Sequence, residues 1–203
     1  YAQLKPGSQE GNSYYAKTLY AEGKYDEALN ILSEVLKADP KSYTGNLYTA
    51  YIYSERELAD SSAQVEQYKQ AIEYFSKVPL KDFEVEDLVK YAKVNVELKN
   101  FTDAYSIFDK AIKMDSTEAR VYYEYGKAHF KAEDYENAVK YLNGATELGM
   151  TERSVYLFKG FSNFYLKKYE DALSSFQDAV KADENFVLSY SWMAKCYIVM
   201  LKN

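Results

Sequence analysis

Cysteine and histidine are nearly absent from this sequence of 203 residues, which has one residue of each, Cys196 and His129. One cysteine cannot form an intramolecular disulfide, and neither residue lies in a motif typical of a nucleophile or a metal site. Cys196 lies in an apolar run, where a buried and inert thiol is the usual state. The sequence therefore predicts a protein that is not an enzyme, with no catalytic residue, no cofactor and no metal ion.

Glycine and proline are also scarce, with eight and three residues. The glycines are dispersed, so no glycine-rich loop for nucleotide phosphates is formed. Only residues 1–11, YAQLKPGSQEG, combine proline and glycine with no helical periodicity. We expect them to be a linker or a frayed N-terminus, followed by a single domain over residues 12–203.

Basic residues are in deficit, since the net charge is −6 and the isoelectric point is near 5.0. This charge argues against nucleic-acid binding, which depends on a basic surface. The longest apolar run, residues 186–201, is too short to span a bilayer and contains Lys195, so we expect no direct membrane insertion. The sequence starts at Tyr1 with no signal-like region, which suggests a processed product or an excised piece, and predicts no compartment.

A repeat is the dominant pattern. Five segments place an aromatic residue three positions before an alanine, and Leu or Phe follows that alanine by four. From the second segment onward the alanines are spaced by 33 or 34 residues, and the first interval has 43. The segments are centred on Ala28, Ala71, Ala104, Ala138 and Ala172.

Small residues precede these segments at a matching interval. Most lie twelve residues before an alanine, and small residues at such sites let two helices approach closely. The pattern predicts a pair of packed helices in each repeat. The small residues are Ala16, Ala50, Ala92, Gly126, Gly160 and Ala194.

The pattern resembles the tetratricopeptide repeat, a unit of 34 residues built from two antiparallel helices. The resemblance covers nearly the whole chain and implies an all-α fold, a right-handed superhelical α-solenoid of five repeats plus a terminal helix. The repeats are expected near residues 9–38, 42–78, 84–114, 118–148 and 153–182, with the last helix at 186–201.

Two departures from the family pattern carry structural expectations. His129 occupies a site between helices that the family gives to an aromatic residue, so we expect it in or near the core. The long first interval includes SERELADSSAQVEQ. Ser61 followed by Gln64 resembles a capping box, which predicts that the extra residues lengthen both helices of the second repeat.

In the resembled family the first helices of successive repeats line a concave groove that receives a peptide or a helix. The matching positions here combine lysines with aromatic side chains, which suits a peptide that is acidic and apolar or that ends in a free carboxylate. The alternative is that the lysines form a solvated face and the aromatic rings only pack repeats together. The predicted groove residues are Lys17, Tyr20, Tyr51, Lys93, Tyr123, Lys127, Phe130, Phe161, Phe164 and Lys195.

The terminal helix is apolar on more than one face, whereas a terminal helix of a solenoid normally turns a polar side outward. Either a further helix follows it, or this surface packs on another protein, possible partners including a second copy of the chain. The predicted assembly surface consists of Trp192, Met193, Tyr197, Ile198 and Met200.

Three functions follow from these patterns. The first is a scaffold that binds a peptide or protein segment in the groove. The second is an assembly subunit that contacts partners through its C-terminal helix, and the third is the regulatory region of a larger enzyme. The sequence identifies neither the partner nor the pathway, and the oligomeric state is left open.

Overall fold

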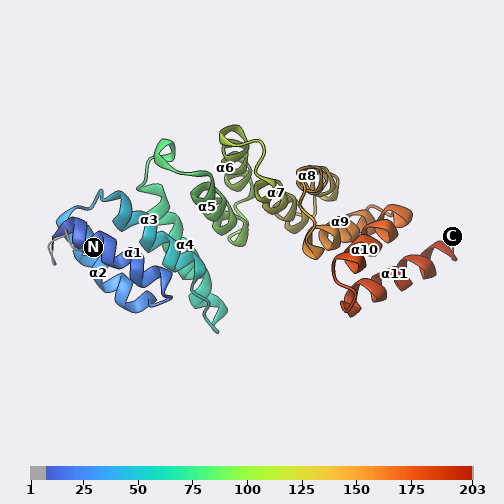
Figure 1. The fold of residues 1–203 in the computed structure, drawn as a ribbon, viewed down its shortest axis with the longest axis horizontal. Helices are drawn as coiled ribbons and strands as arrows, with labels where there is room; N and C mark the ends of the chain where they lie inside the picture. The colour runs from blue at the N-terminus through green and yellow to red at the C-terminus, as the bar shows by residue number, and fades with distance from the viewer. Residues whose placement is uncertain (1–7, 203) are drawn as a thin grey trace. The chain divides into compact units, whose positions relative to one another are not determined.

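The computed structural model describes residues 8–202 and confirms the predicted all-α fold class for that part of the chain (Figure 1). It contains eleven α-helices, one short 3₁₀ helix and no strand among the described residues. The helices are α1 (Gln9–Ala21), α2 (Tyr25–Ala38), α3 (Tyr43–Glu55), α4 (Ser61–Ser76), η1 (Leu80–Asp82), α5 (Val85–Glu97), α6 (Phe101–Met114), α7 (Ala119–Lys131), α8 (Tyr135–Glu147), α9 (Arg153–Tyr165), α10 (Tyr169–Ala182) and α11 (Val187–Met200).

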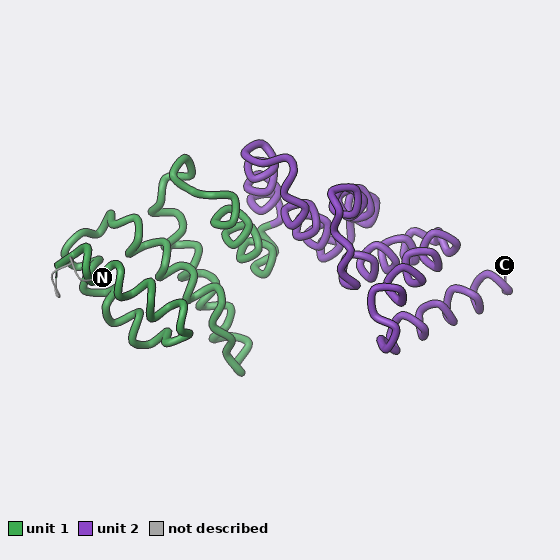
Figure 2. Tube along the Cα trace, viewed as in Figure 1, with its two compact units in different colours: residues 1–100 green, residues 101–203 purple. Residues whose placement is uncertain are grey.

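The helices fall into two compact units (Figure 2). Unit 1 covers residues 1–100 and contains α1 to α5, and unit 2 covers residues 101–203 and contains α6 to α11. The prediction that residues 12–203 form one domain stays a prediction.

Within each unit, consecutive helices pack as pairs through the small residues of the repeat. In unit 1, α1 packs on α2 and α3 on α4, and in unit 2, α7 packs on α8 and α9 on α10. Gly126 of α7 lies against Leu142 of α8, and Gly160 of α9 lies against Phe176 of α10. The small residue lets the large one reach the helix backbone, so the two helices of the pair approach closely.

The turn inside a repeat includes one residue with positive φ, except in the longer connection between α3 and α4. Lys99, Glu133 and Lys167 have φ of 60°, 60° and 62°, and Gly23 has φ of 72° at the equivalent place in the first pair. Just after each of these residues, a backbone N–H returns to the helix, as from Asp134 to the carbonyl of His129 at 3.0 Å. This residue, in the left-handed conformation, ends the first helix, and the second helix begins after a turn of three residues.

The expectation for residues 1–11 is wrong for its last part. Ser8 is the N-cap of α1, and its Oγ accepts a hydrogen bond from the backbone N–H of Gly11 at 3.1 Å. This cap starts the helix at Gln9 despite the glycine in its first turn. Residues 1–7 lie outside the described part of the chain.

The expectation for the second repeat is also wrong in part. The N-cap of α4 is Asp60, whose Oδ1 accepts from Ala63 N at 2.7 Å, and α3 is no longer than α1. Gln64 does not close a capping box, because its side chain bonds to the backbone of Arg56 and Leu58 and holds the preceding loop. The extra residues divide between this loop, a 16-residue α4 and the segment around η1.

No helix among residues 8–202 combines the length and the apolar character that crossing a membrane requires.

Candidate functional site

Unit 2 carries a connected series of aromatic rings on its first helices, α7, α9 and α11. We call it the aromatic row, and every member is half-buried. Ring centroids are 5.2 Å apart between Phe130 and Phe158, and both Phe161 and Phe164 lie 5.0 Å from Trp192. Tyr123 and Phe158 (6.4 Å) and Phe130 and Phe161 (6.2 Å) complete the series. The aromatic row consists of Tyr123, Phe130, Phe158, Phe161, Phe164 and Trp192.

Two lysines predicted for the groove stand over rings of this row. Lys127 Nζ lies 4.9 Å from the ring centroid of Tyr123, and Lys195 Nζ lies 4.0 Å from that of Trp192. Lys127 also pairs with Glu124 at 3.1 Å, whereas Lys195 forms no ion pair with any residue of the described chain. The row therefore has apolar ring faces with positive charge above them.

The predicted groove residues of unit 1 form a different kind of surface. The hydroxyl of Tyr20 donates to Glu55 Oε2 at 2.7 Å, and the same carboxylate pairs with Lys90. Lys90 Nζ also stands 4.7 Å from the ring centroid of Tyr51. Because Glu55 neutralises Lys90, this face offers less net positive charge than the lysines alone indicate.

Asp87 lies buried beneath this face and holds it together. Its carboxylate accepts hydrogen bonds from the hydroxyls of Tyr51 and Tyr43, the latter at 3.2 Å, and from Glu84 N at 2.9 Å. Burial, with the carboxylate beside it, raises the pKa of Tyr43 to about 12 and raises that of Tyr51 further. Both hydroxyls therefore stay protonated donors at physiological pH.

Glu55, Asp87 and Lys90 were missed as site residues from the sequence. Lys90 is not at one of the repeat positions from which the groove lysines were predicted, and the two carboxylates match no groove position. The signal that could have found them is position, because all three lie on first helices, as the predicted groove residues do.

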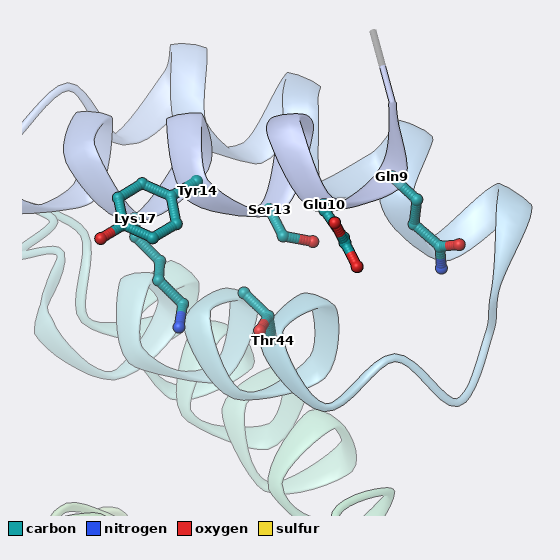
Figure 3. A pocket seen from close by; sticks show the side chains of 6 residues that line it. All are labelled: Gln9, Glu10, Ser13, Tyr14, Lys17 and Thr44. Atoms are coloured by element: carbon teal, nitrogen blue, oxygen red, sulfur yellow. The ribbon is translucent and has the colours of Figure 1, made fainter. Parts of the chain in front are cut away.

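Lys17 lines a pocket of about 460 Å³ between α1 and α3 (Figure 3). The labelled side chains of Gln9, Glu10, Ser13 and Lys17 extend from α1 to the side on which α3 and Thr44 lie. Lys17 Nζ stands 5.3 Å from the ring centroid of Tyr48. Lys93, the other predicted lysine of unit 1, is half-buried on α5.

The predicted assembly surface on α11 divides into two sets. Trp192, Met193 and Met200 pack on the cluster around Phe176 and do not form the outer face, which corrects the prediction. The reason is the register of α11, which turns these three side chains toward α9 and α10. Tyr197 and Ile198 are 48% and 51% exposed. The other exposed apolar residues of this segment are Val187, Leu188, Tyr190 and Leu201.

The single histidine and the single cysteine are buried, as expected for His129. Its ring stacks on Tyr105, with centroids 4.2 Å apart, and its Nδ1 lies 2.9 Å from Asp134 Oδ2. Burial raises the pKa of the Cys196 thiol. Among residues 8–202, no three His, Cys, Asp or Glu side chains are grouped to hold a metal ion.

Family models match both halves of the chain. The tetratricopeptide repeat model matches residues 16–78, and the model of anaphase-promoting complex, cyclosome, subunit 3 matches residues 97–179. The chain belongs to the tetratricopeptide repeat family. No curated protein matches the sequence.

Solved structures share the fold of this tetratricopeptide repeat protein. YrrB, described as a TPR protein with an unusual peptide-binding site, has 16% identity and a TM-score of 0.74, with 91% of each chain covered. The C-terminal part of a TPR protein from Cytophaga hutchinsonii has 23% identity and a TM-score of 0.75, over 91% of this chain and 69% of that one. MamA from Desulfovibrio magneticus RS-1 has 18% identity and a TM-score of 0.75, over 90% and 99%.

Tetratricopeptide repeat proteins bind other proteins or peptides, and the fold supports a role as an interaction scaffold. In this tetratricopeptide protein the first helices carry both surfaces described above, the aromatic row of unit 2 and the hydrogen-bonded face of unit 1.

Proposed function

We propose that this chain is a non-enzymatic scaffold whose aromatic row binds a polypeptide segment that carries apolar side chains and a carboxylate group. The observation that carries the proposal is the contact series itself. Its rings follow one another from α7 to α11, yet each residue remains partly exposed. Rigid aromatic side chains bury large apolar areas at little cost in conformational entropy, which makes them effective binding surfaces.

Lys195 supports the choice of a carboxylate. Its ammonium group lies over Trp192 and has no acidic partner among the described residues, so a ligand carboxylate there would not displace an existing ion pair. Lys127 is less available, because Glu124 already neutralises it. A carboxylate that pairs with Lys195 would also place its neighbouring side chain on Trp192 and Phe164.

Unit 2 is favoured over unit 1 as the binding site because the polar groups on the hydrogen-bonded face of unit 1 already have hydrogen-bond and ion-pair partners. In unit 1 the hydroxyls of Tyr20 and Tyr51 and the ammonium of Lys90 are already satisfied by Glu55 and Asp87. A ligand there would have to break these interactions, whereas the rings of the aromatic row lose only water.

The test is a random peptide library displayed on phage and selected against the protein, followed by fluorescence anisotropy on the selected peptides. We expect peptides rich in Phe, Leu and acidic residues. Lys195→Glu should weaken their binding at least tenfold, because it replaces attraction by repulsion. Lys181→Glu makes the same charge change at an exposed site of α10 and is the matched control.

Two results would contradict the proposal. One is selection of peptides with no acidic or apolar preference. The other is equal affinity of the selected peptides for the Lys195→Glu variant and the unmodified chain.

A further inference from the structure

The pocket between α1 and α3 in unit 1 shares no residue with the aromatic row. Its volume of about 460 Å³ falls within the range of pockets that bind small molecules, about 300–1,000 Å³. The pocket is lined by one aromatic ring and by an amide, a carboxylate, an ammonium group and two aliphatic hydroxyls. These groups belong to Tyr14, Gln9, Glu10, Lys17, Ser13 and Thr44.

The two charged groups of the pocket have opposite signs but do not pair with each other. Glu10 and Lys17 are seven residues apart in α1, which places them about 10 Å apart along the helix, whereas ion pairs on a helix join residues three or four apart. Within residues 8–202 neither side chain forms an ion pair or a hydrogen bond, and Lys17 only stands over the ring of Tyr48. Both charges are therefore available to a ligand.

Two hydroxyl groups lie between these charges. In the view of Figure 3, the side chains of Ser13 on α1 and Thr44 on α3 lie between the carboxylate and the ammonium group. Neither hydroxyl has a hydrogen-bond partner in the described part of the chain. Thr18, on the same helix, instead donates to the carbonyl oxygen of Tyr14 at 3.1 Å. The pocket therefore offers two hydroxyl groups, flanked by a positive and a negative charge.

This order of groups selects a zwitterion. An anion would be attracted by Lys17 but repelled by Glu10, and a cation would meet the reverse, whereas a ligand with both charges gains from both. An extended peptide spans about 3.3–3.6 Å per residue, so the terminal ammonium and carboxylate groups of a tripeptide lie about 10 Å apart. Its peptide groups supply donors and acceptors for the hydroxyls of Ser13 and Thr44.

We propose that this pocket binds a short free peptide of two or three residues, with its carboxylate on Lys17 and its ammonium group on Glu10. An internal segment of a protein carries neither terminal charge, so the pocket favours the free peptide over a loop of a partner protein. The site lies in unit 1 and does not depend on the function proposed for the aromatic row.

Triglycine is the probe, because it has both terminal charges and no side chain that could bind to aromatic rings. Two-dimensional NMR of the backbone amides follows its titration into the full chain, and we expect saturable shifts for α1 and the first turn of α3. Glu10→Gln and Lys17→Gln should each weaken binding at least fivefold. Glu27→Gln and Lys37→Gln make the same changes at exposed sites of α2, and these matched controls should leave the affinity unchanged.

Blocked peptides assign each terminal charge to its partner. Acetylated triglycine lacks the ammonium group, so it should bind more weakly than triglycine and equally well to the unmodified chain and to Glu10→Gln. Triglycine amide lacks the carboxylate, and its affinity should in the same way be insensitive to Lys17→Gln. Such a cycle isolates the contact between one residue and one group of the ligand from any general effect of the substitution on the fold.

Three results would overturn the proposal. The first is the absence of saturable shifts in α1 and α3, and the second is equal affinity for free and blocked triglycine. The third is loss of triglycine binding in Lys195→Glu, which would assign the peptide to the aromatic row. We expect Lys195→Glu to bind triglycine normally, so a failure of this site and a failure of the proposed function are distinguishable.

Discussion

Phe176 lies so close to Gly160 that a Cβ atom at Gly160 would come within 2.5 Å of Phe176 Cε1. Gly126 and Leu142 repeat this contact one pair earlier, at 2.7 Å from Leu142 Cγ. Ala194 holds the same position in α11 and is exposed. One position of the repeat is therefore under strong steric restriction in α7 and α9 and under none in α11.

A leucine at this position should separate the two cases. Gly160→Leu forces the side chain into Phe176 and should lower the free energy of unfolding by about 3 kcal/mol, the upper part of the range for overpacked cores. Ala194→Leu is the matched control and should change it by no more than about 0.5 kcal/mol, as surface substitutions do. Urea unfolding followed by circular dichroism measures both, and equal effects would contradict the packing assignment.

The positive φ angles of Glu133 and Lys167 lead to a second prediction. The left-handed conformation costs a residue with a side chain about 1–2 kcal/mol, and glycine avoids this cost. Part of the benefit is lost, because glycine has a larger conformational entropy in the unfolded chain. Glu133→Gly should therefore raise the free energy of unfolding by about 0.5–1 kcal/mol. Gly23→Ala should act in the opposite direction, because Gly23 has φ of 72°. The thermal melting midpoints of the two variants, compared with that of the unmodified protein, test both predicted directions.

Most of the fold could be predicted from the sequence because the repeat encodes it redundantly. The spacing of Ala138 and Ala172, with small residues twelve positions before each, fixes which helices pair. The structure of the inserted residues in the second repeat was harder to predict. The side chain of Gln64 bonds to the backbone of a loop, and the repeat pattern does not indicate such a contact. Asp60 and Ser61 are both residue types that cap helices well, so the sequence alone does not show that Asp60 is the N-cap.

The candidate site was predicted less completely. The aromatic members Phe130, Phe161 and Phe164 follow from the repeat register. Trp192 was assigned to the wrong side of α11, because composition alone shows that a helix is apolar all round but not which side meets its neighbours. Asp87 escaped prediction because its role depends on the hydroxyls of Tyr43 and Tyr51, which come from another helix.

The buried carboxylate of Asp87 supports a third prediction. Tyr51→Phe removes a buried donor and leaves a charge with fewer partners, which should cost about 2 kcal/mol of stability. Tyr43→Phe removes a donor from a residue that is 39% exposed, where water can replace the hydroxyl, so its cost should be several times smaller. Denaturant titration of the two variants tests this order. A larger effect of Tyr43→Phe would show that the carboxylate does not depend mainly on Tyr51.

His129 gives the last prediction, a pH dependence. Burial among Tyr105, Tyr125 and Tyr141 lowers its pKa, although the hydrogen bond to Asp134 opposes this. The unfolded chain therefore binds a proton near the ordinary histidine pKa of about 6.5, and the folded chain does so only at lower pH. Stability should be constant above that value and fall as the pH drops below it, by at most about 1.4 kcal/mol per pH unit.

Replacing the ring isolates this contribution. His129→Phe keeps the stacking with the tyrosines, cannot take up a proton, and removes Nε2, a buried nitrogen with no hydrogen-bond partner. Asp134 does not confuse the comparison, because its pKa is lowered from 3.8 and its own loss of stability begins only in more acidic solution. Free energies of unfolding at pH 7.5, 6.5 and 5.5 should therefore fall more steeply for the unmodified protein than for His129→Phe. Parallel curves would mean that His129 takes up its proton equally well in the folded and unfolded chains, so that its burial imposes no penalty on the charged ring.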